Sequence, residues 1–397
     1  MFNPTQGLLR TARRSTLEQS VNLSKRRTWH AASALVYGFQ DLESLKNTRV
    51  QEIGITETME RIGQWNGEVN RVFDAIFSTF TVRDERWNIN PIMKYHIPTA
   101  VRPQYVDEYG VAKPQLEESS QQVGLPLWRY ELAHGTSFEA LAKITVEEFS
   151  RKLMRIERGD RKEAIRQFLW ALFNNSNYTF SSVEDSLPDI PVKCLANTDG
   201  QLYILRSDAA PAEAEHYTAQ AGAISDTADP FPGIKTLLTS YVGSSVNDRI
   251  VTFVGDSTNA AAINDLSGFH RVDRTKFTKW GDTVSLVEPS ADTYIGMGEE
   301  VLGEHEEGIL VVRWQSIPAN YLVSINMDAP PPVGIREDAS PALRGLFNIN
   351  ALEQSGNLLL SRYRRKIGMA PVNRTAASVR RIGNPSYAVP SSVTQPG

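Results

Sequence analysis

The stretch of sequence that decides the fold reads Ser316-Ile-Pro-Ala-Asn-Tyr-Leu-Val-Ser-Ile-Asn-Met-Asp328 and is followed by Pro330-Pro331-Pro332. Its second half, Tyr321–Met327, predicts a strand, because aromatic and β-branched residues favour extended backbone. The prolines end this strand, since proline has no backbone N–H to donate to a sheet. The chain continues through Arg336-Glu337, Tyr363-Arg-Arg-Lys-Ile-Gly368 and Val372-Asn-Arg374 to further strand residues between 376 and 390, which include Ile382-Gly383 and Tyr387.

The region before this stretch predicts short strands that alternate with helices. We expect strands at Leu202–Leu205, Arg249–Val254, Val284–Val287 and Gly308–Trp314, and helices at Ile234–Tyr241 and Thr258–Leu266. Turn signals such as Asp199-Gly200 separate these segments. Residues 182–342 are therefore expected to form a mixed α/β segment.

A long helix is predicted further upstream, at residues 145–173. Thr145 and Glu148 have the spacing of a capping box, and the apolar residues that follow recur on one face. Gly159-Asp160 predicts a kink or a break. The opposite face carries Arg151, Lys152, Arg155, Arg158, Arg161, Lys162 and Arg166. We interpret it as a solvated face that is partly paired with Glu147, Glu157 and Glu163.

The first part of the chain predicts a second amphipathic helix and a long hairpin. The helix is expected at residues 56–77, with Thr56 as its N-cap. In residues 78–135, the segments Ile92–Ile97 and Leu125–Leu132 are expected to pair as two strands of one hairpin. This region is rich in proline and tyrosine, which suits a hairpin that leaves its own domain and lies on a neighbour.

Composition and charge exclude several classes of protein. The chain has 397 residues and one cysteine, Cys194, so neither a disulfide framework nor a Cys-rich zinc site is expected. No apolar run approaches the roughly 20 residues of a membrane-spanning helix. The net charge of −4 hides a basic start, an acidic middle and a basic end. Residues 1–40 hold six basic residues and one acidic residue. Residues 182–342 hold ten basic and 24 acidic residues, and residues 343–397 hold eight basic residues and one acidic residue.

Three patterns in the sequence invite a chemical interpretation. Gly255-Asp256-Ser257 after a strand resembles the nucleophile block of one hydrolase family, but no Asp-x-x-His follows it, and we favour a helix cap. Glu304-His305 starts like a zinc motif but lacks the second histidine, which favours an acidic loop. The C-terminal bases fit either phosphate contact or pairing with acidic segments of other subunits. No catalytic, cofactor or metal site is therefore predicted.

The order of these parts resembles that of the major capsid proteins of tailed double-stranded DNA bacteriophages. The strand, the proline stop, Arg336-Glu337, Tyr363-Arg-Arg and Asn373-Arg374 are similar to the succession in some of these families. The resemblance implies an α+β fold of five parts. These are an N-terminal arm with a helix (1–77), an extended loop (78–135), a peripheral domain with a long spine helix (136–190), an axial domain (191–315) and a return to the peripheral domain (316–397).

The resemblance also implies a function and a set of contacts. The chain would assemble as hexamers and pentamers into an icosahedral shell around phage DNA, with no enzymatic activity and no cofactor. Its partners would be copies of itself, portal and scaffolding or decoration proteins, and DNA through non-specific contact, but no membrane. It would belong to the virion and assemble in the host cytoplasm. Because no large segment precedes the basic arm, the scaffold would be separate or absent.

Twelve residues are the expected contacts between subunits. They are Arg13, Arg14, Arg26, Tyr95, Tyr105, Tyr109, Trp128, Tyr130, Arg364, Arg365, Arg380 and Arg381. Two alternatives stay open at this point. One is a nanocompartment shell protein of the same fold that encloses protein cargo, and the other is a serine hydrolase built on Asp256-Ser257.

Overall fold

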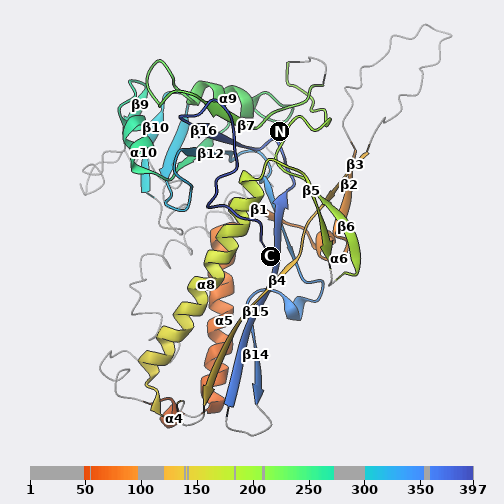
Figure 1. Ribbon diagram of the computed structural model, residues 1–397, viewed down its shortest axis with the longest axis vertical. Helices are drawn as coiled ribbons and strands as arrows, with labels where there is room; N and C mark the ends of the chain where they lie inside the picture. Colours follow the sequence, from red (N-terminus) through yellow and green to blue (C-terminus); the bar gives the residue numbers. More distant parts are fainter. Residues whose placement is uncertain are drawn as a thin grey trace, which may run out of the picture.

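Two long helices and two sheets make up most of the protein in a computed structural model (Figure 1). α5 (Ile55–Phe77) and α8 (Val146–Phe173) lie side by side along the long axis, next to β4, β14 and β15. The larger sheet lies beyond one end of these helices. The structure describes residues 49–53, 55–96, 120–137, 140, 143–182, 185–207, 211–271, 300–352 and 358–396.

Both long helices form where the sequence predicts them, but the expected N-cap Thr56 is wrong, because α5 already begins at Ile55. At the start of α8, the Thr145 side chain accepts a hydrogen bond from the Glu148 backbone, and the Glu148 carboxylate accepts one from the Thr145 backbone. This confirms the capping box. The expected break at Gly159-Asp160 is wrong, because α8 runs unbroken through both residues. The Asp160 carboxylate is buried against the Arg365 guanidinium, which compensates its charge inside the fold.

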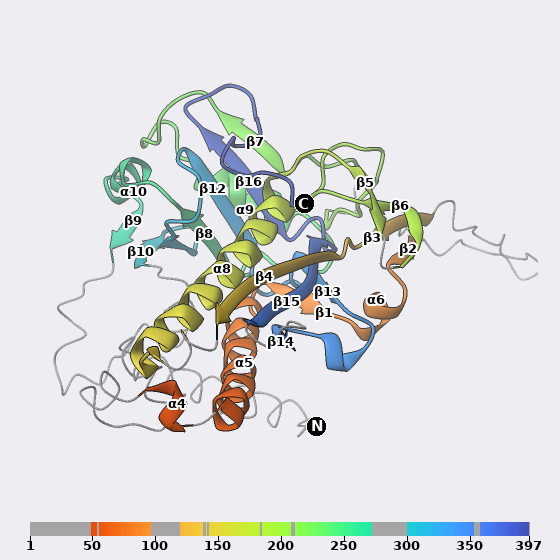
Figure 2. The ribbon, with the colours of Figure 1, turned by 60° about the horizontal axis from the view of Figure 1, so that its bottom comes forward.

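A five-stranded sheet packs against the two long helices (Figure 2). Its order is β1 (Thr81–Arg83), β13 (Val333–Glu337), β15 (Leu358–Pro371) and β14 (Phe347–Leu352), while β4 (Trp128–Ser137) pairs with the long strand β15. Tyr363 of β15 meets Trp65 of α5 edge to face, with ring centroids 6.2 Å apart. Alternate residues of β15 thus face the helices, as the period of two in a strand requires.

A seven-stranded sheet forms the second layer. Its order is β7 (Tyr217–Gln220), β16 (Ala377–Ile382), β12 (Tyr321–Asn326), β8 (Ile250–Val254), β11 (Ile309–Arg313), β10 (Glu300–His305) and β9 (Phe269–Arg271). α9 (Phe231–Thr239) and α10 (Ser257–Asn264) accompany it. The strands expected at residues 321–327 and between residues 376 and 390 are therefore present, as β12 and β16. Residues 316–397 supply strands to both sheets, so a boundary at residue 315 does not separate the two sheets.

Two strand pairs stand apart from these sheets: β2 (Ile92–His96) with β3 (Ser120–Gly124), and β5 (Tyr178–Ser182) with β6 (Leu187–Val192). The hairpin expected from Ile92–Ile97 and Leu125–Leu132 is therefore only half right. Its first strand pairs with residues 120–124, whereas residues 128–137 pair with β15. The ladder of β4 with the 14-residue strand β15 is longer than that of β2 with β3.

A continuous apolar core joins the two sheets. It includes Phe77 of α5, Phe168 and Phe173 of α8, and Phe253 and Tyr321 of the seven-stranded sheet. The expected strand Leu202–Leu205 is wrong, because only Tyr203 and Leu205 make isolated bridges there. The expected strand Val284–Val287 lies outside the described residues.

Candidate functional site

The base of the β2–β3 ribbon is a buried polar site to which several segments of the described structure contribute. The ribbon begins after the short helix α6 (Glu85–Ile89), which Asp84 caps by accepting a hydrogen bond from the Arg86 backbone. Trp87 of α6 is buried with Leu125 and Ile190, and its indole N–H donates to the Met93 sulfur in β2. The apolar contacts thus fix the point at which the ribbon leaves the body.

Arg336 holds this base together from within β13. The side chain is fully buried, and its guanidinium donates to the carbonyl of Trp87 at 3.0 Å and to that of Leu125 at 3.3 Å. It also donates to the Asp185 carboxylate at 2.6 Å, between β5 and β6. Burial opposes the ionised form of Asp185, but the hydrogen bond from Arg336 keeps its pKa below the usual value. One cation therefore ties three segments to the five-stranded sheet.

Two glycines allow the backbones to approach closely at this base. A Cβ at Gly334 would lie 2.9 Å from the Trp87 ring and 2.7 Å from Val372. A Cβ at Gly124, the last residue of β3, would overlap the Ile190 side chain of β6. A larger residue at Gly124 would push the ribbon away from the pair β5–β6, and one at Gly334 would displace Trp87 and Val372.

The structure describes some of the expected subunit contacts and not others. Arg13, Arg14, Arg26, Tyr105 and Tyr109 lie outside the described residues, and Tyr95 lies in β2. Trp128 and Tyr130 lie in β4 rather than in the hairpin. Trp128 packs against Phe180 with ring centroids 4.6 Å apart, and burial raises the pKa of Tyr130 well above its usual value. The contacts to other subunits stay a prediction for all of them.

The four C-terminal arginines are bonded within their own chain. Arg364 pairs with Glu131 at 2.9 Å, and Arg365 pairs with Asp160 at 2.7 Å. Arg380 donates to the Pro230 carbonyl at 3.0 Å, and Arg381 donates to the Ser386 carbonyl at 3.2 Å. The Arg365 guanidinium is buried and also lies 4.1 Å over the Phe73 ring, so it is fully occupied inside its own subunit.

Arg374, which follows Val372-Asn373 in the sequence, is a third buried arginine. Its guanidinium donates to the Cys194 carbonyl at 2.7 Å and to the Asp199 carboxylate at 2.9 Å. Burial alone would raise the pKa of Asp199, but hydrogen bonds from Asn177 and Arg374 outweigh it and bring that pKa to about 2. Arg336 and Arg374 are thus structural cations that sequence patterning does not reveal, because charged residues are rarely buried.

The residues that looked chemical in the sequence have structural roles. Asp256 caps α10 by accepting a hydrogen bond from the Asn259 backbone, as we favoured. His305 does not lie in an acidic loop: it is buried in β10, with Nε2 3.1 Å from the Asp229 carboxylate and its ring stacked on Phe231. Among the described residues, no three histidine, cysteine or carboxylate side chains are grouped as metal ligands.

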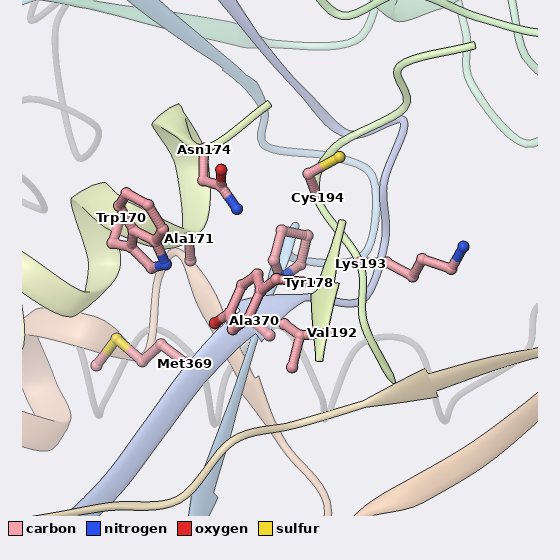
Figure 3. A pocket seen from close by; sticks show the side chains of 10 residues that line it. Trp170, Ala171, Asn174, Tyr178, Val192, Lys193, Cys194, Met369 and Ala370 are labelled. Atoms are coloured by element: carbon pink, nitrogen blue, oxygen red, sulfur yellow. The ribbon is translucent and has the colours of Figure 1, made fainter. Parts of the chain in front are cut away.

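A narrow crevice lies where the end of α8 meets β6 and the end of β15 (Figure 3). Trp170, Tyr178, Val192 and Met369 line it, and their side chains leave no room for a molecule even of the size of water. Sites for small molecules typically have roughly 300–1,000 Å3. The neighbouring Cys194 is not activated, because burial raises the pKa of its thiol to about 11. Of the helices in the described ranges, none has the length and hydropathy needed to cross a bilayer.

Comparison with known proteins finds similarity in structure but not in sequence. No family model and no curated protein matches the chain. A solved chain of Mycobacterium phage Patience superposes with a TM-score of 0.63 at 19% identity, over 89% of this chain and 92% of that one. The mature capsid of bacteriophage PhiM1 gives a TM-score of 0.46 at 9% identity, over 78% and 87%. An encapsulin complex from Synechococcus elongatus gives a TM-score of 0.38 at 10% identity, over 75% of this chain and 85% of that one.

Proposed function

We propose that this chain, which has the α+β fold of tailed-phage major capsid proteins, is the major capsid subunit of a tailed phage. It would assemble as hexamers and pentamers into an icosahedral shell that encloses double-stranded DNA. The observation that carries the proposal is the similarity to the Patience chain, which extends over nearly the whole of both chains. A fold alone does not define a function, so assembly has to be tested directly.

The arrangement of the described elements supports this proposal. The five-stranded sheet with α5 and α8 would be the peripheral domain, and the seven-stranded sheet with α9 and α10 the axial domain. The β2–β3 ribbon would carry the extended loop, and the buried Arg336 at its base would fix its direction. A shell protein needs large interfaces, and a rigidly held projection enlarges the interface without enlarging the core.

The partners follow from the same proposal. The subunit would contact copies of itself, a portal, and scaffolding or decoration proteins, and it would meet DNA without sequence specificity. It would act as a structural protein without enzymatic activity, in virions assembled in the host cytoplasm. The structural roles of Asp256 and His305 agree with this, since neither side chain is arranged for catalysis.

The experiment compares the full chain with a variant that has a shortened ribbon. His96 and Ser120 are partners at the end of the β2–β3 ladder, so a two-residue Asn-Gly turn can replace residues 97–119. We expect the full chain to sediment as large particles and the variant to remain a folded, small species with an unchanged circular dichroism spectrum. Normal particles from the variant would show that the ribbon does not join subunits. Extracted particles that hold protein cargo instead of DNA would identify a nanocompartment shell.

A further inference from the structure

A row of basic side chains runs along the outer face of α8. Beyond the first turn of the helix, four residues are exposed, and all four are basic: Arg151, Arg155, Arg158 and Lys162. They follow one another at steps of four, three and four residues, which places them on one face of a helix with 3.6 residues per turn. The row spans about 16 Å along the helix axis, at a rise of about 1.5 Å per residue.

The acidic residues of α8 lie mostly beside this row and leave two of its members without a counter-charge in the described structure. Glu157 and Glu163 pair with Arg161 and Arg166, each at 2.8 Å, beside the row rather than within it. Asp160 is turned inward to Arg365. Glu147 reaches only the first member of the row, Arg151, at 2.6 Å.

Two members of the row have no counter-charge in the described structure. No carboxylate of the described residues lies within ion-pair distance of Arg155 or Lys162. The sequence favoured a solvated, partly paired face. The pairing is confirmed for Arg151, Arg161 and Arg166, whereas Arg155 and Lys162 keep their positive charge uncompensated among the described residues.

We propose that this row contacts the phosphate backbone of double-stranded DNA, so that α8 lies on the DNA-facing side of the shell. The inference rests on the proposed function, because it names the surface that meets the enclosed DNA. Guanidinium and ammonium groups bind phosphate oxygens through charge-assisted hydrogen bonds. DNA presents one negative charge per roughly 1.7 Å of helix axis, so a straight row of cations meets several phosphates at once.

The composition of the row favours DNA over an acidic segment of a neighbouring subunit. Interfaces between proteins are enriched in aromatic residues, methionine and arginine and depleted in lysine, so the feature of the row that discriminates is its lack of apolar and aromatic residues. The exposed positions of the row hold no apolar residue, and none of the large exposed apolar side chains of the described structure lies on α8. A purely cationic surface with no apolar centre fits a polyanion bound without sequence specificity.

The test uses two triple variants of the full chain with the same change in charge. The row variant carries Arg155→Gln, Arg158→Gln and Lys162→Gln, and glutamine is a good helix former. The control carries Arg71→Gln, Arg249→Gln and Arg271→Gln, at exposed arginines outside α8. Binding to a 24-base-pair duplex of mixed sequence is measured against salt concentration, and each lost phosphate contact lowers the logarithmic slope by about 0.9.

We expect the row variant to lose about 2 to 3 units of slope and at least ~10-fold in affinity near 0.1 M salt, while the control stays close to the unsubstituted chain. Equal losses in the two variants, or no DNA binding by the unsubstituted chain, would overturn the inference. So would a row variant that binds the duplex normally but fails to form particles, because the row would then be a protein contact. Absence of particles from the unsubstituted chain would refute the proposed function and leave the duplex measurement valid.

Discussion

Replacement of Arg336 by methionine tests whether one buried cation fixes the base of the ribbon. The side chain is 0% exposed and bonds to Trp87, Leu125 and Asp185. Methionine fills a similar volume, so the loss comes from the polar contacts rather than from a cavity. Removal of one partner from a buried pair costs about 3–5 kcal/mol, and because Asp185 keeps some contact with water, we expect about 3 kcal/mol.

The assay is denaturant unfolding of the unassembled subunit, followed by tryptophan fluorescence, since association would add to the apparent stability. Arg249→Met is the matched control: that arginine also pairs with an aspartate, Asp328, at 2.7 Å, but its side chain is 72% exposed. Exposed pairs contribute about 0–1 kcal/mol, so the control should change little. If Arg336→Met does not fold, Arg336→Lys, which keeps a charge near Asp185, should unfold at an intermediate denaturant concentration. Equal losses for Arg336→Met and Arg249→Met would refute the reasoning.

Three further predictions concern the fold. Arg365→Met and Asp160→Asn should each lower the free energy of unfolding by about 3–5 kcal/mol, because each leaves a buried charge without its partner. The double variant should lose at least ~1 kcal/mol less than the sum of the two single losses. Strictly additive losses in denaturant unfolding would show that the two side chains do not interact. Burial lowers the pKa of His216 to about 4, so stability should be complete above pH ~6.5 and fall toward pH 4 by up to ~1.4 kcal/mol per unit. His216→Asn should weaken this dependence of stability on pH. An unchanged dependence would show that another group causes it. Gly124→Ala should lower the melting temperature, because its Cβ overlaps Ile190, whereas Gly63→Ala in α5, where a Cβ meets nothing within 4 Å, should raise it or leave it unchanged.

Local signals in the sequence predict the elements well where the cause is local. The capping box of Thr145 and Glu148 fixes the start of α8, and Asp256 fixes that of α10. The apolar periodicity of 56–77 gives α5, and the β-branched residues before the proline run give β12. Each of these depends on contacts within one turn of helix or one strand.

Features that depend on distant partners could not be predicted. The sequence predicts a hairpin strand at residues 125–132, but the strand there is β4, whose partner is β15, more than 200 residues further along the chain. Gly159-Asp160 read as a helix break because the compensating Arg365 is equally remote. Likewise, nothing around Arg336 indicates that it is buried, because its partners come from three separate segments.

Cryo-electron microscopy of particles formed by the purified full chain tests the central claim most directly. The account predicts closed shells with five-fold and six-fold clusters of one subunit, in which the β2–β3 ribbon of each subunit extends over a neighbour. A chain that remains a small, folded monomer at high concentration, or particles in which the ribbon contacts only its own subunit, would contradict it.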